Sequence, residues 1–249
     1  MATDDATELD ARIDRCLDRT AAIVADRPRW VRRDGAGGGV ERAEVVDDAG
    51  AVRLVVDERN PLDESAGGAP PLAVDGASLV VWSGSLAGPF PEHLETPTPL
   101  NWMPPGGRAL ADWLDRLDED ARARRWIRPH ARHVLSDPPS VRAWWRRRAE
   151  AAGGTPPVGG LALDLAALLE PSMLGDADEH LRLHLRNLGD LASVVMLADV
   201  RIDADRCRAV PPGEGALGPS AWEAMRAGLA DFVAPGVPVV VLLPGTGEA

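Results

Sequence analysis

The chain has 249 residues, a length that suits one α/β barrel or one doubly wound sheet and requires no second domain. Its net charge is −12 and all 27 basic residues are arginine. This balance argues against a general nucleic-acid binder and excludes a lysine Schiff base, a P-loop lysine or a pyridoxal phosphate linkage. Two cysteines, Cys16 and Cys207, are too few for a disulfide framework. With no apolar stretch of about 18 residues and an acidic N-terminus unlike a signal peptide, we expect a cytoplasmic protein with no membrane contact.

The first quarter of the chain predicts one helix and one hairpin. Apolar residues at helical spacing predict a helix over 7–26. The glycine run at 34–39 lacks the spacing of a dinucleotide-binding loop, and we interpret it as a flexible turn. Residues 41–46 and 52–57 are apolar-rich and are joined by DDAG, which predicts a hairpin.

The middle of the chain predicts two strands separated by a long loop and a helix. After a Pro/Gly loop over 58–77, LVVWS at 79–83 predicts a buried strand. Six prolines in 84–107 mark a lid or a binding loop. Leucines and tryptophan at helical spacing predict a helix over 110–121, and HARHVLS at 130–136 predicts the next strand.

The C-terminal half alternates strand and helix. SDPPS at 136–140 predicts a turn, and Val141, Trp144, Trp145 and Ala149 predict a helix after it. Within 158–201, two short apolar runs each end in an aspartate and flank an amphipathic helix, which predicts a right-handed βαβ unit. Ser220 and Glu223, at capping-box spacing, predict the start of a helix over 220–233. A last apolar strand follows at 237–243, so the alternation predicts a parallel sheet.

Four motifs between residues 78 and 243 follow one another along the chain. They are LVVWSG at 79–84, GLALDLAALL at 160–169, VVMLADVR at 194–201 and PPGEGAL at 211–217. Over about residues 78–243 the chain resembles the xylose-isomerase-like TIM barrels, the sugar phosphate isomerase/epimerase superfamily. The resemblance implies a (β/α)₈ TIM-barrel-like α/β fold in one domain over 1–249, incomplete or irregular in its N-terminal third.

The resemblance also implies a divalent metal held by carboxylates and histidine, and acidic groups that move a proton beside a sugar carbonyl. Carried over residue by residue, the catalytic candidates are Asp164, Asp199 and Glu214, with Asp164 as a weak metal ligand. Ala167 and Met196 stand where the family has histidines. The ligand set is therefore incomplete, and we expect a degenerate metal site.

Four further residues are candidates for binding a carbohydrate-like substrate: His133, Asp137, Arg201 and Trp82. His133 and Asp137 lie near the end of the predicted strand at 130–136, and Arg201 or His133 would steady an oxyanion. His130 and His133, three apart in a strand, are expected to face opposite ways.

Each candidate also has a structural interpretation. Parallel strands would bring Asp164 and Asp199 to one rim, either as an acid/base pair or as loop caps and partners of Arg201. His180 and His184 share one side of a helix, but no HExxH glutamate lies between them, so packing roles are favoured.

The segment 122–148 carries nine arginines and one acid, for a net charge of +8. Its arginines and tryptophans could bind phosphate, nucleic acid or an acidic partner. The alternative is an amphipathic helix with core tryptophans and a solvated arginine face, and an internal partner in the acidic helix 112–120 is a further interpretation.

Two functional hypotheses remain from the sequence. The first is an isomerase or epimerase that moves a proton on a sugar-like hydroxy-carbonyl compound. The second is a non-catalytic barrel, a pseudoenzyme, that serves as a ligand-binding or scaffold protein. An endonuclease-like role within the same superfamily is disfavoured by the net negative charge.

Overall fold

The computed structural model describes residues 29–33, 42–46, 52–57, 59–62, 77–88, 96–117, 119–154 and 159–241. The predicted helix over 7–26, the glycine run at 34–39, Cys16 and most of the loop over 58–77 lie outside these residues. None of the helices in the described ranges is long and apolar enough to cross a membrane.

Eight strands of the described chain form one sheet, and two more form a separate hairpin. The sheet consists, in spatial order, of β1 (Arg29–Arg33), β2 (Arg42–Val46), β3 (Val52–Asp57), β4 (Ser78–Trp82), β5 (Arg125–Arg128), β6 (Gly160–Asp164), β7 (Ala192–Leu197) and β10 (Val239–Val241). The hairpin consists of β8 (Asp199–Asp203) and β9 (Arg206–Val210).

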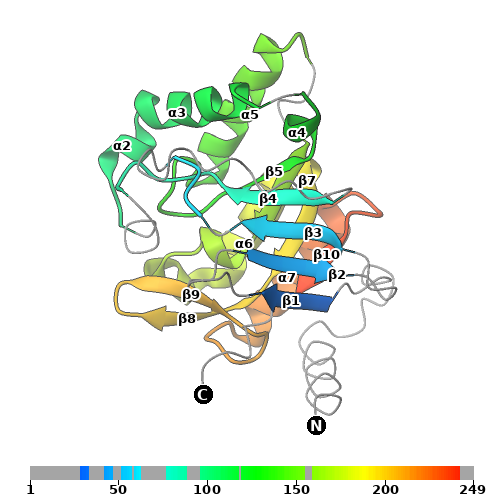
Figure 1. Cartoon of the computed structure of the whole chain (residues 1–249). Helices are drawn as coiled ribbons and strands as arrows, with labels where there is room; N and C mark the ends of the chain where they lie inside the picture. The colour runs from blue at the N-terminus through cyan, green and yellow to red at the C-terminus, as the bar shows by residue number, and fades with distance from the viewer. Residues whose placement is uncertain are drawn as a thin grey trace.

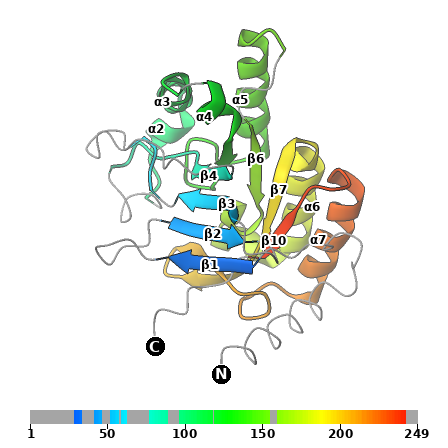
Figure 2. The same cartoon turned by 45° about the vertical axis from the view of Figure 1, so that its right-hand side comes forward.

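Six neighbouring strands, β3 through β7 and β10, run parallel, whereas β1–β2 and β2–β3 pair antiparallel. The sheet curls until its edge strands β1 and β10 come into contact, as Figures 1 and 2 show from two sides. The chain therefore has an α/β fold of partial TIM-barrel type. The irregularity expected in the N-terminal third is confirmed, because the antiparallel β1 and β2 take the place of a βα unit.

The central strands are buried on both faces, which explains their continuous apolar runs. Every residue of β6 is buried, as are the last four residues of β4 and of β7. Gly160 lets β6 approach β7 closely, since a Cβ there would lie 1.9 Å from Ser193 Oγ. The predicted βαβ unit is confirmed: β6 and β7 are parallel and are linked through a helix.

The helices lie outside the curl. They are α2 (Pro99–Trp102), α3 (Pro104–Asp115), α4 (Glu119–Ala123), α5 (Pro138–Ala151), α6 (Ala177–Leu188) and α7 (Pro219–Phe232). In Figure 2, α6 and α7 cover the β7–β10 side, and α3, α4 and α5 cover the β4–β6 side. Gly228 lets α7 pack on α6, because a Cβ there would lie 2.7 Å from Leu185 Cδ1.

Residues 130–136 do not form the predicted strand. The strand at this place is β5, which was not predicted because its RWIR pattern carries two charges. Arg125 and Arg128 are each only 5% exposed, so their aliphatic stems occupy the sheet interior. The segment after β5 is instead a compact loop, in which His130 N–H donates to Leu135 O at 3.2 Å.

Three other expectations need correction. The 84–107 segment is not all loop, because Pro99 and Pro104 open α2 and α3 at positions where proline favours a helix start. Helix α7 begins at Pro219 with Gly218 as its N-cap, so Ser220 and Glu223 form no capping box. The β8–β9 hairpin was not predicted, and its turn holds Ala204 at a φ of +56°.

Candidate functional site

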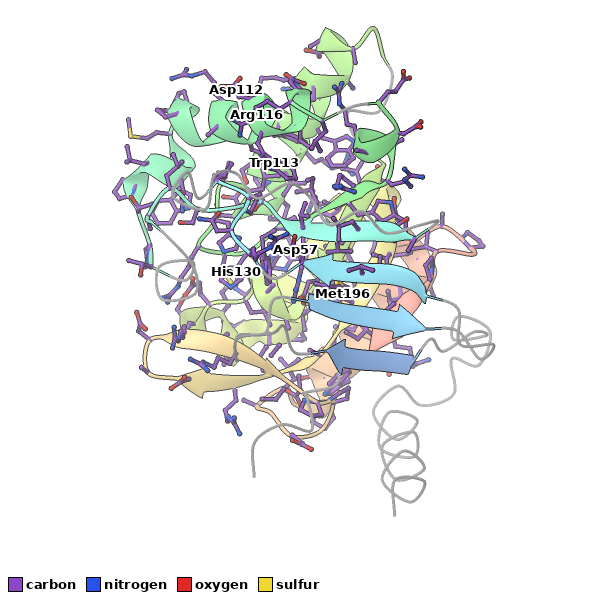
Figure 3. The ribbon with its side chains drawn as sticks, in the orientation of Figure 1. Asp57, Asp112, Trp113, Arg116, His130 and Met196 are labelled. Carbon is purple, nitrogen blue, oxygen red and sulfur yellow. The ribbon has the colours of Figure 1, made fainter. Side chains whose placement is uncertain are left out.

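The parallel strands bring their carboxyl ends to one edge of the curled sheet, and polar side chains gather there. These ends carry Asp57 on β3, Trp82 on β4, Arg128 on β5, Asp164 on β6 and Asp199 just after β7. Figure 3 shows Asp57, His130 and Met196 around this edge. It corresponds to the rim at which TIM-barrel sites form.

Arg128 is at the centre of this edge and was not among the predicted site residues. Its Nε and Nη2 both donate to Asp164 Oδ2, at 2.9 and 2.5 Å. Its guanidinium carbon lies 3.7 Å from the ring centroid of Trp82, a cation–π contact. Arg128 and Asp164 are 36 residues apart in the sequence, and the parallel pairing of β5 with β6 brings them together.

The second oxygen of Asp164 holds the loop that follows β6. Asp164 Oδ1 accepts hydrogen bonds from the backbone N–H groups of Ala166 and Ala167, at 3.1 and 3.2 Å. These residues lie in the 3₁₀ helix Ala166–Leu168 that follows the strand. The carboxylate of Asp164 is fully buried and accepts four hydrogen bonds from its own chain.

Asp199 holds the PGEG loop in the same manner. Its Oδ1 accepts from Val200 N at 2.7 Å and from Leu217 N at 3.0 Å, and its Oδ2 accepts from Gly213 N at 3.0 Å. The loop wraps so closely that a Cβ on Gly215 would lie 2.2 Å from Asp199 Oδ1. Within this loop, Glu214 is exposed.

His130 and His133 stack on each other instead of facing opposite ways, because the segment that carries them is a loop. Their ring centroids are 4.5 Å apart, and each ring meets the edge or face of Trp82, at 5.5 and 5.1 Å. His130 Nδ1 accepts from Arg132 N at 3.1 Å. Burial, followed by the nearby charges of Arg128 and Arg132, lowers the pKa of His130 to about 3. His130 is therefore neutral at pH 7, and His133 is fully buried.

Arg132 joins three loops at this edge and was also missed as an individual residue. Its guanidinium forms a bidentate pair with Glu170, with both N–O distances 2.9 Å, and it contacts Asp205 in the β8–β9 turn. The hydrogen bonds that Arg132 donates to Glu170 raise the pKa of Arg132 against the opposing effect of burial. Arg132 therefore stays charged and fixes the loop after β5 to the loop after β6 and to the hairpin.

Two buried amides complete the rim. Asn60 donates to Ser85 O at 2.8 Å and accepts from Ser85 N at 3.0 Å. Asn101 accepts from Leu86 N at 2.7 Å and donates to Ser85 Oγ at 2.9 Å and to Arg132 O at 2.8 Å. Together they fix the loops after β3, β4 and β5. No sequence motif marked either residue.

The remaining predicted substrate-binding residues lie in different settings. Trp82 is 7% exposed, covered by Arg128 and the two histidines. Asp137 is exposed and caps α5, with Oδ1 accepting from Ser140 N at 2.7 Å. Arg201 is exposed on the β8–β9 hairpin, opposite Arg208. The structure does not bring Asp137 or Arg201 into the Trp82–Arg128–Asp164 cluster.

The side chains present do not fit the divalent metal that the family resemblance implies. No group of three or more histidine, cysteine or acidic residues that could hold a metal ion occurs among the described residues. Asp164 would have to give up Arg128 and two backbone amides to act as a ligand. A hard cation needs several converging oxygen or imidazole ligands, which this edge does not supply.

Two titratable groups outside the edge, His184 and Cys207, are buried or half-buried. His184 on α6 is 4% exposed, and burial, with the charge of His180 nearby, lowers the pKa of His184 to about 4. Cys207 is half-buried on β9, and burial raises the pKa of its thiol to about 11. The favoured packing interpretation of His184 agrees with its place among the buried residues of α6.

No family model matches the chain, and no curated protein is similar to it. Among solved structures, a "xylose isomerase-like TIM barrel/4-hydroxyphenylpyruvate dioxygenase fusion protein" is similar, with a TM-score of 0.40 and 21% sequence identity. The match covers 70% of this chain and 25% of that one, so this chain corresponds to about a quarter of the fusion protein's length.

Proposed function

We propose that this chain is a non-catalytic barrel that binds a ligand or acts as a scaffold, rather than a sugar isomerase. The observation that carries the proposal is that the carboxylate of Asp164 is fully occupied by hydrogen bonds within the chain. Its carboxylate accepts two hydrogen bonds from Arg128 and two from backbone amides. A carboxylate has about four lone-pair positions, so the motif aspartate has none left to direct at a substrate.

Asp199 supports the same proposal. Three backbone N–H groups bind its carboxylate, and two of them belong to the loop over 211–217. A general base must reach the proton that it removes, directly or through one water molecule. Both strand-end aspartates thus follow the capping interpretation, although their partners are Arg128 and backbone amides instead of Arg201.

A second candidate function is proton transfer without a metal, and the neutral form of the His130 side chain favours it. A neutral imidazole whose Nδ1 accepts a hydrogen bond carries its proton on Nε2 and can donate it to a substrate carbonyl. Glu214, exposed on the PGEG loop, would be the base. We rank this candidate second because Glu214 lies on the loop after β9, whereas His130 lies on the loop after β5.

The ligand class implied by the family resemblance, a carbohydrate-like small molecule, is retained in the binding hypothesis. Saturation-transfer NMR of the full chain with a panel of aldoses and ketoses would test it directly. Binding that disappears in Trp82→Ala, and survives in Trp145→Ala, would place the ligand at the strand-end edge.

Solvent-deuterium exchange separates the two candidates. Hydroxy-ketone sugars are incubated with the protein in D₂O, with and without Mg²⁺, Mn²⁺ or Zn²⁺, and proton NMR follows loss of the α-proton. The proposal predicts no exchange above the buffer rate and no metal-induced rise in melting temperature. Exchange that disappears in Glu214→Gln or His130→Phe, and persists in the surface variant Asp231→Asn, would overturn it.

A further inference from the structure

A groove beside the strand-end edge has the features of a second binding site. It lies between α2–α3 on one side and α5 on the other, and its floor comes from the loops after β5 and β6. Its volume is about 830 Å³, within the range of small-molecule sites. Figures 1 and 2 show α3 and α5 next to each other above the sheet.

The two walls of the groove are fixed to each other at both ends. Trp144 Nε1 on α5 donates to Gly107 O on α3 at 3.3 Å. Arg148 on α5 pairs with Asp115 at the end of α3, with N–O distances of 3.0 and 2.5 Å, and this hydrogen bond lowers the pKa of Asp115. On α3, Trp113 faces the sheet while Asp112 and Arg116 face outward (Figure 3). The groove is therefore preformed, which reduces the entropy cost of binding.

The apolar part of the groove is large and partly open to solvent. Trp102 and Met103 line it, and each is 53% exposed. Trp144 and Met173 extend the apolar lining toward the floor. Neighbouring half-exposed large apolar side chains, bordered by charged ones, are typical of a binding surface. Indole rings also offer flat faces on which an aromatic ligand can stack.

Two arginines give the groove its charge, one from each wall. Arg108 on α3 and Arg147 on α5 line the groove, are exposed, and have no ion pair with another side chain in the described part of the chain. Other arginines of α5 do have such partners: Arg148 pairs with Asp115, and Arg146 lies 3.9 Å from Glu150. Arg108 and Arg147 are thus available for a ligand.

The acidic groups in the lining are already engaged. Glu170 pairs with Arg132, and Asp137 caps α5 through Ser140 N. The lining carries three arginines, Arg108, Arg147 and Arg148, against these two acids, on a chain whose net charge is −12. Electrostatic attraction there would favour an anion, and guanidinium groups match the geometry of carboxylate and phosphate.

We propose that this groove binds a small organic anion, namely an apolar, ring-sized body that carries a carboxylate. The ring would lie against Trp102 and Met103, and the carboxylate would be held by Arg108 and Arg147. The groove shares the loops after β5 and β6 with the strand-end edge, but the side chains proposed to hold the ligand lie on α2, α3 and α5.

Calorimetric titration of the full chain with 1-naphthoate, and with the uncharged 1-naphthylmethanol as its neutral counterpart, tests the proposal. We expect the carboxylate to bind at least tenfold more tightly than the alcohol. Arg108→Gln and Arg147→Gln should each weaken 1-naphthoate binding about tenfold or more and leave binding of the alcohol unchanged. Trp102→Ala should weaken both.

Arg146→Gln is the matched control, because Arg146 is an exposed arginine of α5 outside the groove lining. It should bind both compounds as the unmodified chain does. Equal affinity for carboxylate and alcohol, or unchanged naphthoate binding in Arg108→Gln and Arg147→Gln, overturns the proposal. A fluorescein-labelled acidic amphipathic peptide forms the last arm. If the peptide binds in an Arg108- and Arg147-dependent manner and 1-naphthoate does not, the groove is a protein contact and the small-anion proposal is wrong.

Discussion

Arg128 places two guanidinium nitrogens on a single carboxylate oxygen of Asp164, at 2.9 and 2.5 Å, in a setting where neither side chain is more than 6% exposed. A buried ion pair contributes little net stability by itself, yet breaking it by removing one partner is costly. The effect of removing Arg128 on the free energy of unfolding therefore tests whether the pair is formed.

Arg128→Leu leaves the buried charge of Asp164 with only its two backbone donors. We expect the free energy of unfolding to fall by about 3–5 kcal/mol, as measured by urea denaturation at pH 7. Arg124→Leu, which removes an exposed arginine just before β5, should change it by less than about 0.5 kcal/mol. A loss below about 1 kcal/mol for Arg128→Leu would mean that the pair is not formed in solution.

Asp199→Ala removes the acceptor for three backbone N–H groups at once. We expect a loss of about 2–4 kcal/mol in the free energy of unfolding, because hydrogen bonds to charged groups contribute about 1.5–3 kcal/mol each and are not additive. Hydrogen exchange at the Gly213 and Leu217 amides should accelerate at the same time. Asp231→Ala, at an exposed position of α7, is the control and should leave both amides protected.

Gly215→Ala tests the close approach of the PGEG loop to the same carboxylate. The added methyl group would lie 2.2 Å from Asp199 Oδ1 and 2.3 Å from Val200 O, so the loop must shift. We expect a cost of about 1–3 kcal/mol, the range found for overpacked sites. Gly175→Ala, at an exposed position of the segment after β6, meets nothing within 4 Å and should be nearly neutral. Equal stabilities of the two variants would contradict the loop geometry.

His184 makes stability depend on pH. Its folded-state pKa of about 4 lies below the ordinary value of 6.5, so the unfolded chain binds a proton more readily than the folded one. Its contribution is complete above pH 6.5 and is lost as the pH falls from 6.5 toward 4. At pH 4.5 the resulting loss in the free energy of unfolding is about 2.5 kcal/mol, at about 1.36 kcal/mol per pH unit.

Denaturant titrations between pH 4.5 and 7 would measure the effect. His184→Leu removes the titrating ring, so the drop in stability over this interval should shrink by about 2.5 kcal/mol. His180→Gln, on the half-exposed face of the same helix, should retain most of the drop. If His184→Leu and the unmodified chain lose stability in parallel over this interval, the ring is not buried in its neutral form.

The fold could be predicted where burial dictates the sequence pattern. The strands β6 and β7 and the helix α6 follow from continuous apolar runs and helical spacing, because tertiary burial reinforces the local pattern there. The strand β5 was missed and residues 130–136 were misassigned for the converse reason. The charged groups of Arg125 and Arg128 made β5 look unlike a buried strand. The segment HARHVLS contains apolar residues, but it forms a loop and does not pair with a strand.

The candidate site could be predicted in position but not in detail. The aspartates at the ends of β6 and β7 do lie at one edge, as parallel strands require. The groups that donate hydrogen bonds to these two carboxylates could not be predicted. Asp164 is bound by Arg128, which is 36 residues away in the sequence, and both aspartates are bound by backbone amides, which every sequence contains. Asn60 and Asn101 were missed because their partners are also backbone groups of distant loops.

The carboxylate of Asp199, enclosed by the loop that it organises, affects how a mutational survey of this protein should be interpreted. Replacing this aspartate would lower cellular abundance by unfolding the loop, and an assay of growth or yield would score the position as intolerant. A catalytic aspartate would give the same score. Only a survey that measures the amount of folded protein separately from its biological output can tell an architectural acid from a chemical one.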